Sequence, residues 1–148
     1  MATYRAPIDD MMFLFEKLRD NSHYNSLEKY KEVNPDLAKD ILEQAAKLTE
    51  NLILPLAKAG DETPAKLENG VVRTPPGYKE VYKKFIEDGW VSLSCDPEYG
   101  GQGMPNTIKT FFDEMLSSAS LSFKLYSELS IGAYNCIVHH GTDSIKKK

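Results

Sequence analysis

Apolar residues recur at steps of three and four residues in several segments of this chain, and that spacing is typical of amphipathic helices. The segments cover about residues 8–18, 35–58, 78–89, 105–119 and 121–138. The strand signals are confined to "ENGVV", whose Asn-Gly pair is the turn signal of a short hairpin near residues 66–74. The sequence therefore predicts an all-α fold of five main helices with at most a short hairpin.

Individual residues help to set the ends of these helices. Pro55 predicts a kink or an end in the last turn of the helix over 35–58, because proline lacks an N–H group and its ring clashes with the preceding turn. Gly89 stands where a helix would end in a left-handed residue. The polar stretch over 21–33 is predicted as a loop or a weak helical turn. No domain boundary is compelling, so we expect one domain over residues 1–148.

Composition excludes several classes of function. The chain has 148 residues, with 18 basic and 22 acidic side chains and a formal net charge of −4, so it does not support nucleic-acid binding. It contains no apolar run of about 18 residues and no basic start followed by an apolar core, so we expect neither a membrane span nor a signal peptide. We expect a cytoplasmic protein. Cys95 and Cys136 have no CxxC partner and are expected to be reduced thiols.

A glycine-rich loop lies between two of the predicted helices, in the stretch "GWVSLSCDPEYGGQGMP". Gly100, Gly101 and Gly103 lack the "GK[ST]" ending of a Walker A loop and the strand that precedes a dinucleotide-binding fingerprint. A phosphate cradle is therefore disfavoured, and we expect a tight turn between helices that needs glycine for its backbone angles. Trp90 and Tyr99 are predicted to brace this corner.

Other polar residues show no pattern of catalytic or metal-binding chemistry. His139 and His140 are adjacent and would point about 100° apart on a helix, so they cannot chelate one metal and are predicted to end a helix before a glycine. His23 is far from the other two histidines in the sequence. Asp96 and Glu98 are expected to make turn hydrogen bonds rather than to form a catalytic carboxylate pair. From its residues alone the chain displays no active site.

The last predicted helix differs from the others because it is apolar on nearly all sides, which is typical of a buried helix. Leaving Ile131, Tyr134 and Val138 in water would cost several kcal/mol, since burial of such side chains is worth about 1.5–3 kcal/mol each. The preceding helices have one apolar stripe each and can cover only one side of it. We therefore expect the isolated chain to self-associate through this helix.

Taken together, several stretches resemble the N-terminal helical domain of the acyl-CoA dehydrogenase family. They are "YRAPIDDMMFLFEKL", "GYKEVYKKFIEDGW", "LSCDPEYGGQGMP", a helix with an acid at Glu114, and "LYSELSIGAYNCIVHHGTDSIKK". The resemblance spans nearly the whole chain and is greatest to the 3-methylmercaptopropionyl-CoA dehydrogenase-like branch. It identifies residues 1–148 as the N-terminal helical domain, without the β domain and the C-terminal helical bundle of that family.

The resemblance implies an oxidoreductase that uses FAD to convert an acyl-CoA thioester into an enoyl-CoA. In the family, electrons pass to an electron-transfer flavoprotein, the catalytic glutamate lies in the C-terminal bundle, and the main flavin contacts come from the β domain. The resemblance therefore implies that this chain alone holds neither the base nor FAD, and that the complete enzyme is a homo-oligomer. It makes Ser127, Ser130, Ile131 and Tyr134 candidates for contact with the acyl group, although these four residues could instead pack against other domains.

Two hypotheses follow from the sequence. The first is that the chain is the N-terminal part of a flavin-dependent acyl-CoA dehydrogenase, to which it contributes scaffold and part of the acyl pocket. The alternative is a stand-alone, non-catalytic helical module that binds a protein partner or an acyl group. The sequence does not specify which acyl-CoA would be used.

Overall fold

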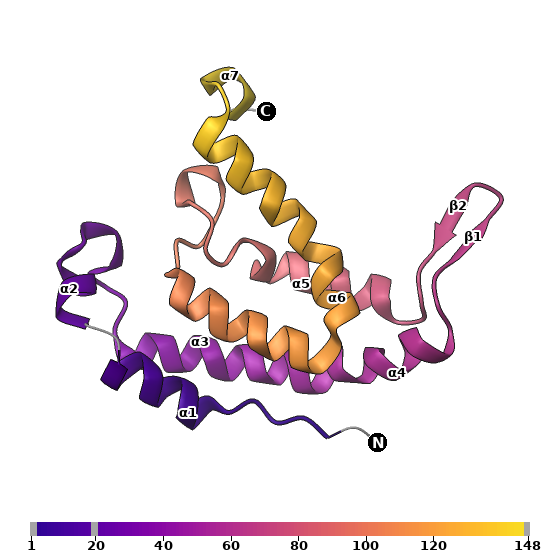
Figure 1. The fold of residues 1–148 in the computed structure, drawn as a ribbon, viewed down its shortest axis with the longest axis horizontal. Coiled ribbons are helices and arrows are strands. Elements are labelled where there is room, and N and C mark those ends of the chain that lie inside the picture. Colours follow the sequence, from indigo (N-terminus) through magenta and orange to yellow (C-terminus); the bar gives the residue numbers. More distant parts are fainter. Residues whose placement is uncertain (1–2, 19–20, 147–148) are drawn as a thin grey trace.

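The computed structural model describes residues 3–18 and 21–146, and its architecture confirms the all-α prediction (Figure 1). The α-helices are α1 (Ile8–Phe13), α2 (Asn21–Ser26), α3 (Pro35–Leu48), α4 (Leu54–Glu62), α5 (Tyr78–Glu87), α6 (Asn106–His140) and α7 (Asp143–Lys146). Two π-helical turns are Leu14–Leu18 and Thr49–Ile53, and three 3-10 turns are Glu28–Tyr30, Trp90–Ser92 and Pro97–Tyr99. The segment predicted as a loop or weak turn thus contains α2 and a 3-10 turn.

A two-stranded hairpin is the only sheet in the described residues, with β1 at Lys66–Glu68 and β2 at Val71–Arg73. The strands are antiparallel, and Leu67 lies opposite Val72. Asn69 and Gly70 form the turn with φ values of 52° and 78°, the left-handed angles that an Asn-Gly hairpin turn requires. The predicted hairpin is confirmed, and it extends away from the helical body between α4 and α5 (Figure 1).

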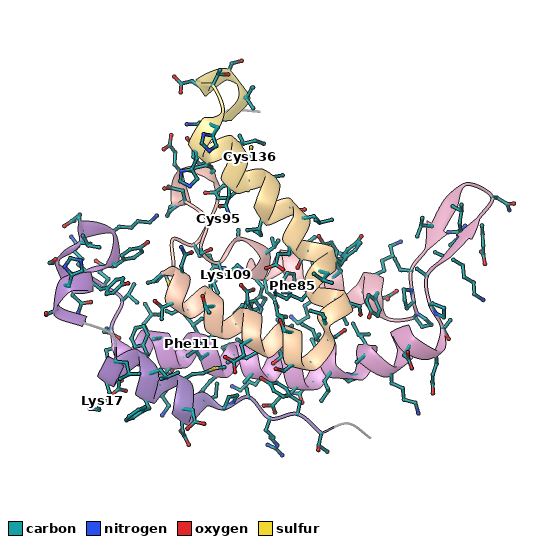
Figure 2. All side chains as sticks on the ribbon, in the orientation of Figure 1. Lys17, Phe85, Cys95, Lys109, Phe111 and Cys136 are labelled. Atoms are coloured by element: carbon teal, nitrogen blue, oxygen red, sulfur yellow. The ribbon has the colours of Figure 1, made fainter. Side chains whose placement is uncertain are left out.

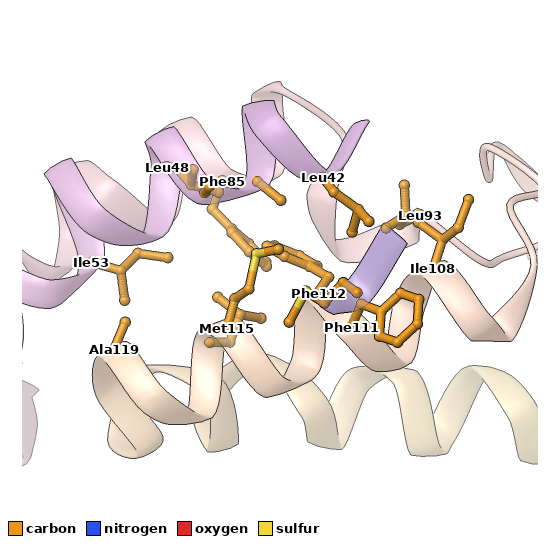
Figure 3. Close-up of a cluster of buried hydrophobic side chains, with 14 of the residues drawn as sticks. Leu42, Leu48, Ile53, Phe85, Leu93, Ile108, Phe111, Phe112, Met115 and Ala119 are labelled. Atoms are coloured by element: carbon orange, nitrogen blue, oxygen red, sulfur yellow. The ribbon is translucent and has the colours of Figure 1, made fainter. Parts of the chain in front are cut away.

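The hydrophobic core lies where the start of α6 runs alongside α3, with α1 and α5 contributing side chains (Figures 1 and 3). The apolar stripe predicted for the helix over 105–119 is buried throughout and consists of Ile108, Phe111, Phe112, Met115, Leu116 and Ala119. Leu42 of α3 and Phe85 of α5 are also almost fully buried. Phe85 stacks on Phe112 with ring centroids 6.1 Å apart. One periodic face per helix is therefore enough to define this core.

A π-helical turn joins α3 to α4 and corrects one prediction. The Leu54 amide donates to the carbonyl of Thr49, five residues earlier, and the Thr49 hydroxyl donates to the carbonyls of Ala45 and Ala46 at 2.9 and 3.1 Å. This wider turn lies directly before Pro55 and relieves the clash that proline would have with a regular preceding turn. The helix consequently continues to Glu62, and the prediction that it ends near residue 58 is wrong.

The long helix α6 is broken at Ser120, which has the extended angles φ −161° and ψ 99°. The Phe123 amide donates to the Ser120 hydroxyl oxygen at 3.4 Å, so Ser120 caps the helix that follows. The chain turns back on itself at this point (Figure 1). The two helices predicted over 105–119 and 121–138 are therefore present, and we call residues 106–119 the first half and 121–140 the second half of α6.

The second half of α6 carries exposed apolar residues, although not those that the sequence predicted. Ile131, Tyr134 and Val138 are half-buried, so the expectation that the rest of the chain leaves these three residues uncovered is wrong. Their side of the helix faces the rest of the chain. Besides Tyr126, the exposed large apolar residues are Leu121, Leu125, Leu129 and Ile137, with Leu129 the most open at 82%. We call these four residues the leucine face.

Candidate functional site

The glycine-rich loop uses its own backbone amides to hold its shape. The amides of residues 100 to 104 all donate to carbonyls of the preceding turns, at distances of 2.9–3.1 Å. The acceptors include the carbonyls of Asp96 and Cys95, which bind the amides of Gly101 and Gly103. A phosphate cradle needs amides that point outward without a partner. The prediction that these glycines are structural is therefore confirmed.

Steric fit explains why glycine occurs here. A side chain at Gly101 would place its Cβ 2.1 Å from the carbonyl oxygen of Cys95, which is far inside contact distance. Gly100 and Gly103 have φ values of +81° and +68°, in the region that favours glycine. The loop thus forms a rigid corner that fixes where α6 begins.

Tyr134, from the second half of α6, reaches this corner. The Asp96 amide donates to the Tyr134 hydroxyl at 2.7 Å, across 38 positions of sequence. Tyr99 is 38% exposed, so the prediction that Tyr99 braces the corner is not supported and Tyr134 takes that part. Trp90 does brace the corner, because its ring lies 4.9 Å from that of Phe112.

The thiol of Cys95 lies beneath the same corner. Burial raises the pKa of Cys95, while Lys109 and the contact with Tyr134 lower it by less. The thiol is therefore protonated at neutral pH. Cys136, on the second half of α6, is exposed (Figure 2). Both cysteines are free thiols, as predicted.

The four predicted acyl-contact residues lie along one side of the second half of α6, at steps of three and four residues. Ser127 is buried, and its hydroxyl donates to the carbonyl of Lys124 at 3.0 Å. Ser130 is exposed, and Ile131 and Tyr134 are half-buried. Ile131 borders a small hollow beside Phe85 and Trp90. This side can offer apolar surface and one free hydroxyl, but it brings together no acid and base.

Two ion pairs, which the sequence reasoning did not single out, border the same hollow. Lys109 pairs with Asp113 at 2.5 Å, and Lys124 pairs with Glu128 at 2.8 Å, both at an i, i+4 spacing. That spacing was the available signal. The Lys109 and Asp113 side chains are only 16% and 24% exposed, so the pair is shielded from water more than the other ion pairs on the surface. Each pair neutralises itself, so the hollow carries no net charge.

The remaining candidates take structural positions. His139 and His140 end α6 before Gly141, as predicted. The Asp96 side chain accepts from the Glu98 amide at 3.0 Å, which is the predicted turn hydrogen bond. Within residues 3–18 and 21–146, no three His, Cys, Asp or Glu side chains lie close enough to hold a metal ion. None of the helices in that part of the chain is long and apolar enough to cross a membrane.

Comparison with known proteins decides the family. Residues 35–148 match the family model described as "Acyl-CoA dehydrogenase, N-terminal domain". The chain belongs to the acyl-CoA dehydrogenase family. The first half and second half of α6, the glycine-rich corner and α5 all lie within this N-terminal domain match.

Two curated acyl-CoA dehydrogenase relatives match almost the whole chain. It is 38% identical over 144 residues to the 3-methylmercaptopropionyl-CoA dehydrogenase of Ruegeria pomeroyi, covering 97% of this chain and 24% of the relative. It is 27% identical over 150 residues to the broad-specificity linear acyl-CoA dehydrogenase FadE5 of Mycobacterium tuberculosis, covering 99% of this chain and 24% of that relative. The chain thus spans about a quarter of the length of the relatives it matches.

Acyl-CoA dehydrogenases as a family use FAD, so the fit of this domain to a flavin can be examined. The glycine-rich corner is the segment whose amides could have received the flavin's phosphates, and those amides are all bonded within the loop. There is also no room for an added atom beside Gly101, because the backbone carbonyl of Cys95 occupies that space. The corner therefore does not fit a flavin pyrophosphate.

Proposed function

We propose that this chain is the N-terminal helical part of a FAD-dependent acyl-CoA dehydrogenase that oxidises an acyl-CoA thioester to the enoyl-CoA. The observation that supports this most is the match of residues 35–148 to the N-terminal domain of that family. The names of the two relatives, both acyl-CoA dehydrogenases, point to the same reaction class. In this proposal a β domain and a C-terminal helical bundle supply the flavin site and the base, and an electron-transfer flavoprotein accepts the electrons.

Within that enzyme, the second half of α6 would form part of the acyl pocket. Ser130 and Ile131 keep accessible surface and would contact the acyl group directly. Ser127 and Tyr134 lie on the same side and complete the proposed set, with Tyr134 also fixing the helix against the glycine-rich corner. A helix held at a rigid corner suits this task, because positioning of the substrate depends on a fixed wall.

The pocket assignment can be tested by kinetics on the protein expressed from its complete reading frame. Ile131→Ala should raise the KM for acyl-CoA about tenfold, because loss of apolar contact in a substrate pocket costs about 1–3 kcal/mol. The matched control is Ile86→Ala, which shortens an isoleucine on α5 that is already 46% exposed. If both variants change the KM equally, or if neither changes it, the second half of α6 is not part of the pocket.

One observation favours the alternative of a stand-alone helical module. The described residues bury a contiguous core that includes Phe15, Leu42, Phe85, Phe112 and Phe123, which supports a domain that folds by itself. Such a module would bind a protein partner or an acyl group without chemistry. Intact mass measurement of the protein from its natural cells discriminates between the two proposals. A mass several times the 16.7 kDa of this chain supports the dehydrogenase, and a mass near that value supports the module.

We further propose that the intact protein is a cytoplasmic homo-oligomer. The leucine face supports self-association, because three leucines that are each more than half exposed lie in a row on one helix. Neither the location nor the oligomeric state is needed for the acyl-pocket proposal.

A further inference from the structure

A groove opens between the hairpin, α5 and the start of the second half of α6. It has a volume of about 830 Å³, which lies within the usual range of about 300–1,000 Å³ for small-molecule sites. Its lining is mainly apolar and aromatic, and includes Val71, Val72, Pro75, Tyr78, Tyr82 and Tyr126. None of the four proposed acyl-contact residues lines it. The groove is therefore a separate feature of the domain.

One wall of the groove is rigid. Tyr82 and Tyr126 meet edge to face with ring centroids 4.7 Å apart, and Tyr78 packs against Phe123 at 5.9 Å. The hydroxyls of Tyr78 and Ser122 are 2.7 Å apart and share a hydrogen bond, which ties α5 to α6. This wall is preformed for an apolar body, and ligand binding would not have to order it.

The opposite wall is the hairpin, which exposes apolar surface to the groove. Val71 is 50% exposed and Val72 is 64% exposed, and both line the hollow. Two-stranded hairpins are marginally stable without packing on at least one face. An apolar ligand between Val71 and the tyrosine wall would supply that packing, because Val71 lies on the same face of the strand as Arg73.

The charge of the groove is opposite to that of the chain. Arg73 and Lys79 line it, and among the described residues no Asp or Glu does, although the whole chain carries −4. Lys66 lies directly opposite Arg73 in the hairpin, and like charges at that position destabilise the pairing. Arg73 pairs with the exposed Glu68 at 3.8 Å. Lys66 and Lys79 make no ion pair within the described part of the chain. Lys66 does not line the groove, so an anion bound here would act as a counter-charge to Arg73 and Lys79.

We propose that this groove binds a small soluble anionic amphiphile, with an apolar body against the tyrosine wall and a phosphate head between Arg73 and Lys79. Arginine suits a phosphate because its guanidinium donates two parallel hydrogen bonds to the oxygens. The ligand is a single small molecule rather than a membrane surface, because the apolar residues face one another across a hollow. This inference does not depend on the proposed dehydrogenase function.

Calorimetric titration of the 148-residue chain with dodecyl phosphate, below the concentration at which it forms micelles, tests the proposal. We expect saturable binding of one molecule per chain, with weaker binding of dodecyl maltoside and of inorganic phosphate. Arg73→Ser with Lys79→Ser should weaken the affinity about tenfold, which corresponds to the loss of two exposed charge contacts. The matched control is Lys83→Ser with Lys84→Ser, which removes the same charge from residues of α5 that do not line the groove.

Four results of the titrations with soluble ligands would overturn the proposal. They are the absence of saturable binding, an equal loss in the control pair, equal affinity for dodecyl maltoside, and loss of binding when Leu125 and Leu129 are changed to lysine. The last result would place the amphiphile on the leucine face. Anionic phospholipid vesicles provide a further arm, and tighter binding to vesicles that depends on Arg73 and Lys79 would replace the soluble ligand by a membrane. Unfolding by urea, followed by circular dichroism, verifies that each variant is folded.

Discussion

Gly101→Ala should destabilise the domain by about 3–5 kcal/mol. The new Cβ would lie 2.1 Å from the oxygen and 2.2 Å from the carbon of the Cys95 carbonyl, and these backbone atoms cannot rotate away. Relief requires the loop to move, which breaks the hydrogen bonds from Gly101 to Asp96 and from Gly103 to Cys95. Each bond is worth about 1 kcal/mol, and overpacking adds about 1–3 kcal/mol.

The assay is urea unfolding followed by far-ultraviolet circular dichroism, with two matched glycine variants. At Gly132 a Cβ meets nothing within 4 Å, so Gly132→Ala should stabilise the helix by about 0.5–1 kcal/mol. At Gly100 there is also free space but φ is +81°, so Gly100→Ala should cost about 1–2 kcal/mol. If the free energy of unfolding of Gly101→Ala lies within about 0.5 kcal/mol of that of the native chain, the corner is not packed as described.

Three further outcomes are expected. Tyr134→Phe should lower the free energy of unfolding by about 1 kcal/mol, because the Asp96 amide loses its acceptor; an unchanged urea midpoint contradicts this. Leu125→Lys with Leu129→Lys should lower the oligomeric state in analytical ultracentrifugation, since both leucines are more than half exposed; a native chain that is already monomeric at high concentration refutes it. Burial raises the pKa of Cys95 above its ordinary value of 9.0. The protonated thiol therefore contributes stability that is fully present below pH 9.0 and is lost as the pH rises through the pKa of Cys95 in the folded state. Ellman's reagent at mildly alkaline pH should therefore modify Cys136 quickly and Cys95 only after unfolding, and equal rates would contradict the burial of Cys95.

Helix positions were predictable because their signals are local. Asn34 accepts from the Leu37 amide and Pro35 opens α3, while Gly89 has φ +77° just beyond α5. The hairpin turn at Asn69 was predictable for the same reason. Ser120 could also have been recognised as a helix cap three residues before Phe123, but Ser117, Ser118 and Ser122 lie close by and offer competing cap positions.

The parts that could not be predicted depend on contacts between distant residues. The π-helical turn at Thr49 keeps the helix continuous before Pro55, and no residue pattern announces such a turn. Periodicity placed Ile131 and Tyr134 on one side of a helix but could not say whether the glycine-rich corner covers that side. For the same reason, the exposed face was assigned to Ile131 instead of Leu129. The acyl-contact set itself stays a prediction.

The most direct test of the account is the absorbance of the flavin in the protein expressed from its complete reading frame. We expect this protein to be purified with bound FAD, an acyl-CoA to bleach the oxidised flavin anaerobically, and enoyl-CoA to be formed in equal amount. We also expect the 148-residue chain alone to be colourless and inactive with the same acyl-CoA. A complete protein that holds no flavin, or whose flavin no acyl-CoA bleaches, would contradict the assignment of this domain to an acyl-CoA dehydrogenase that performs the reaction.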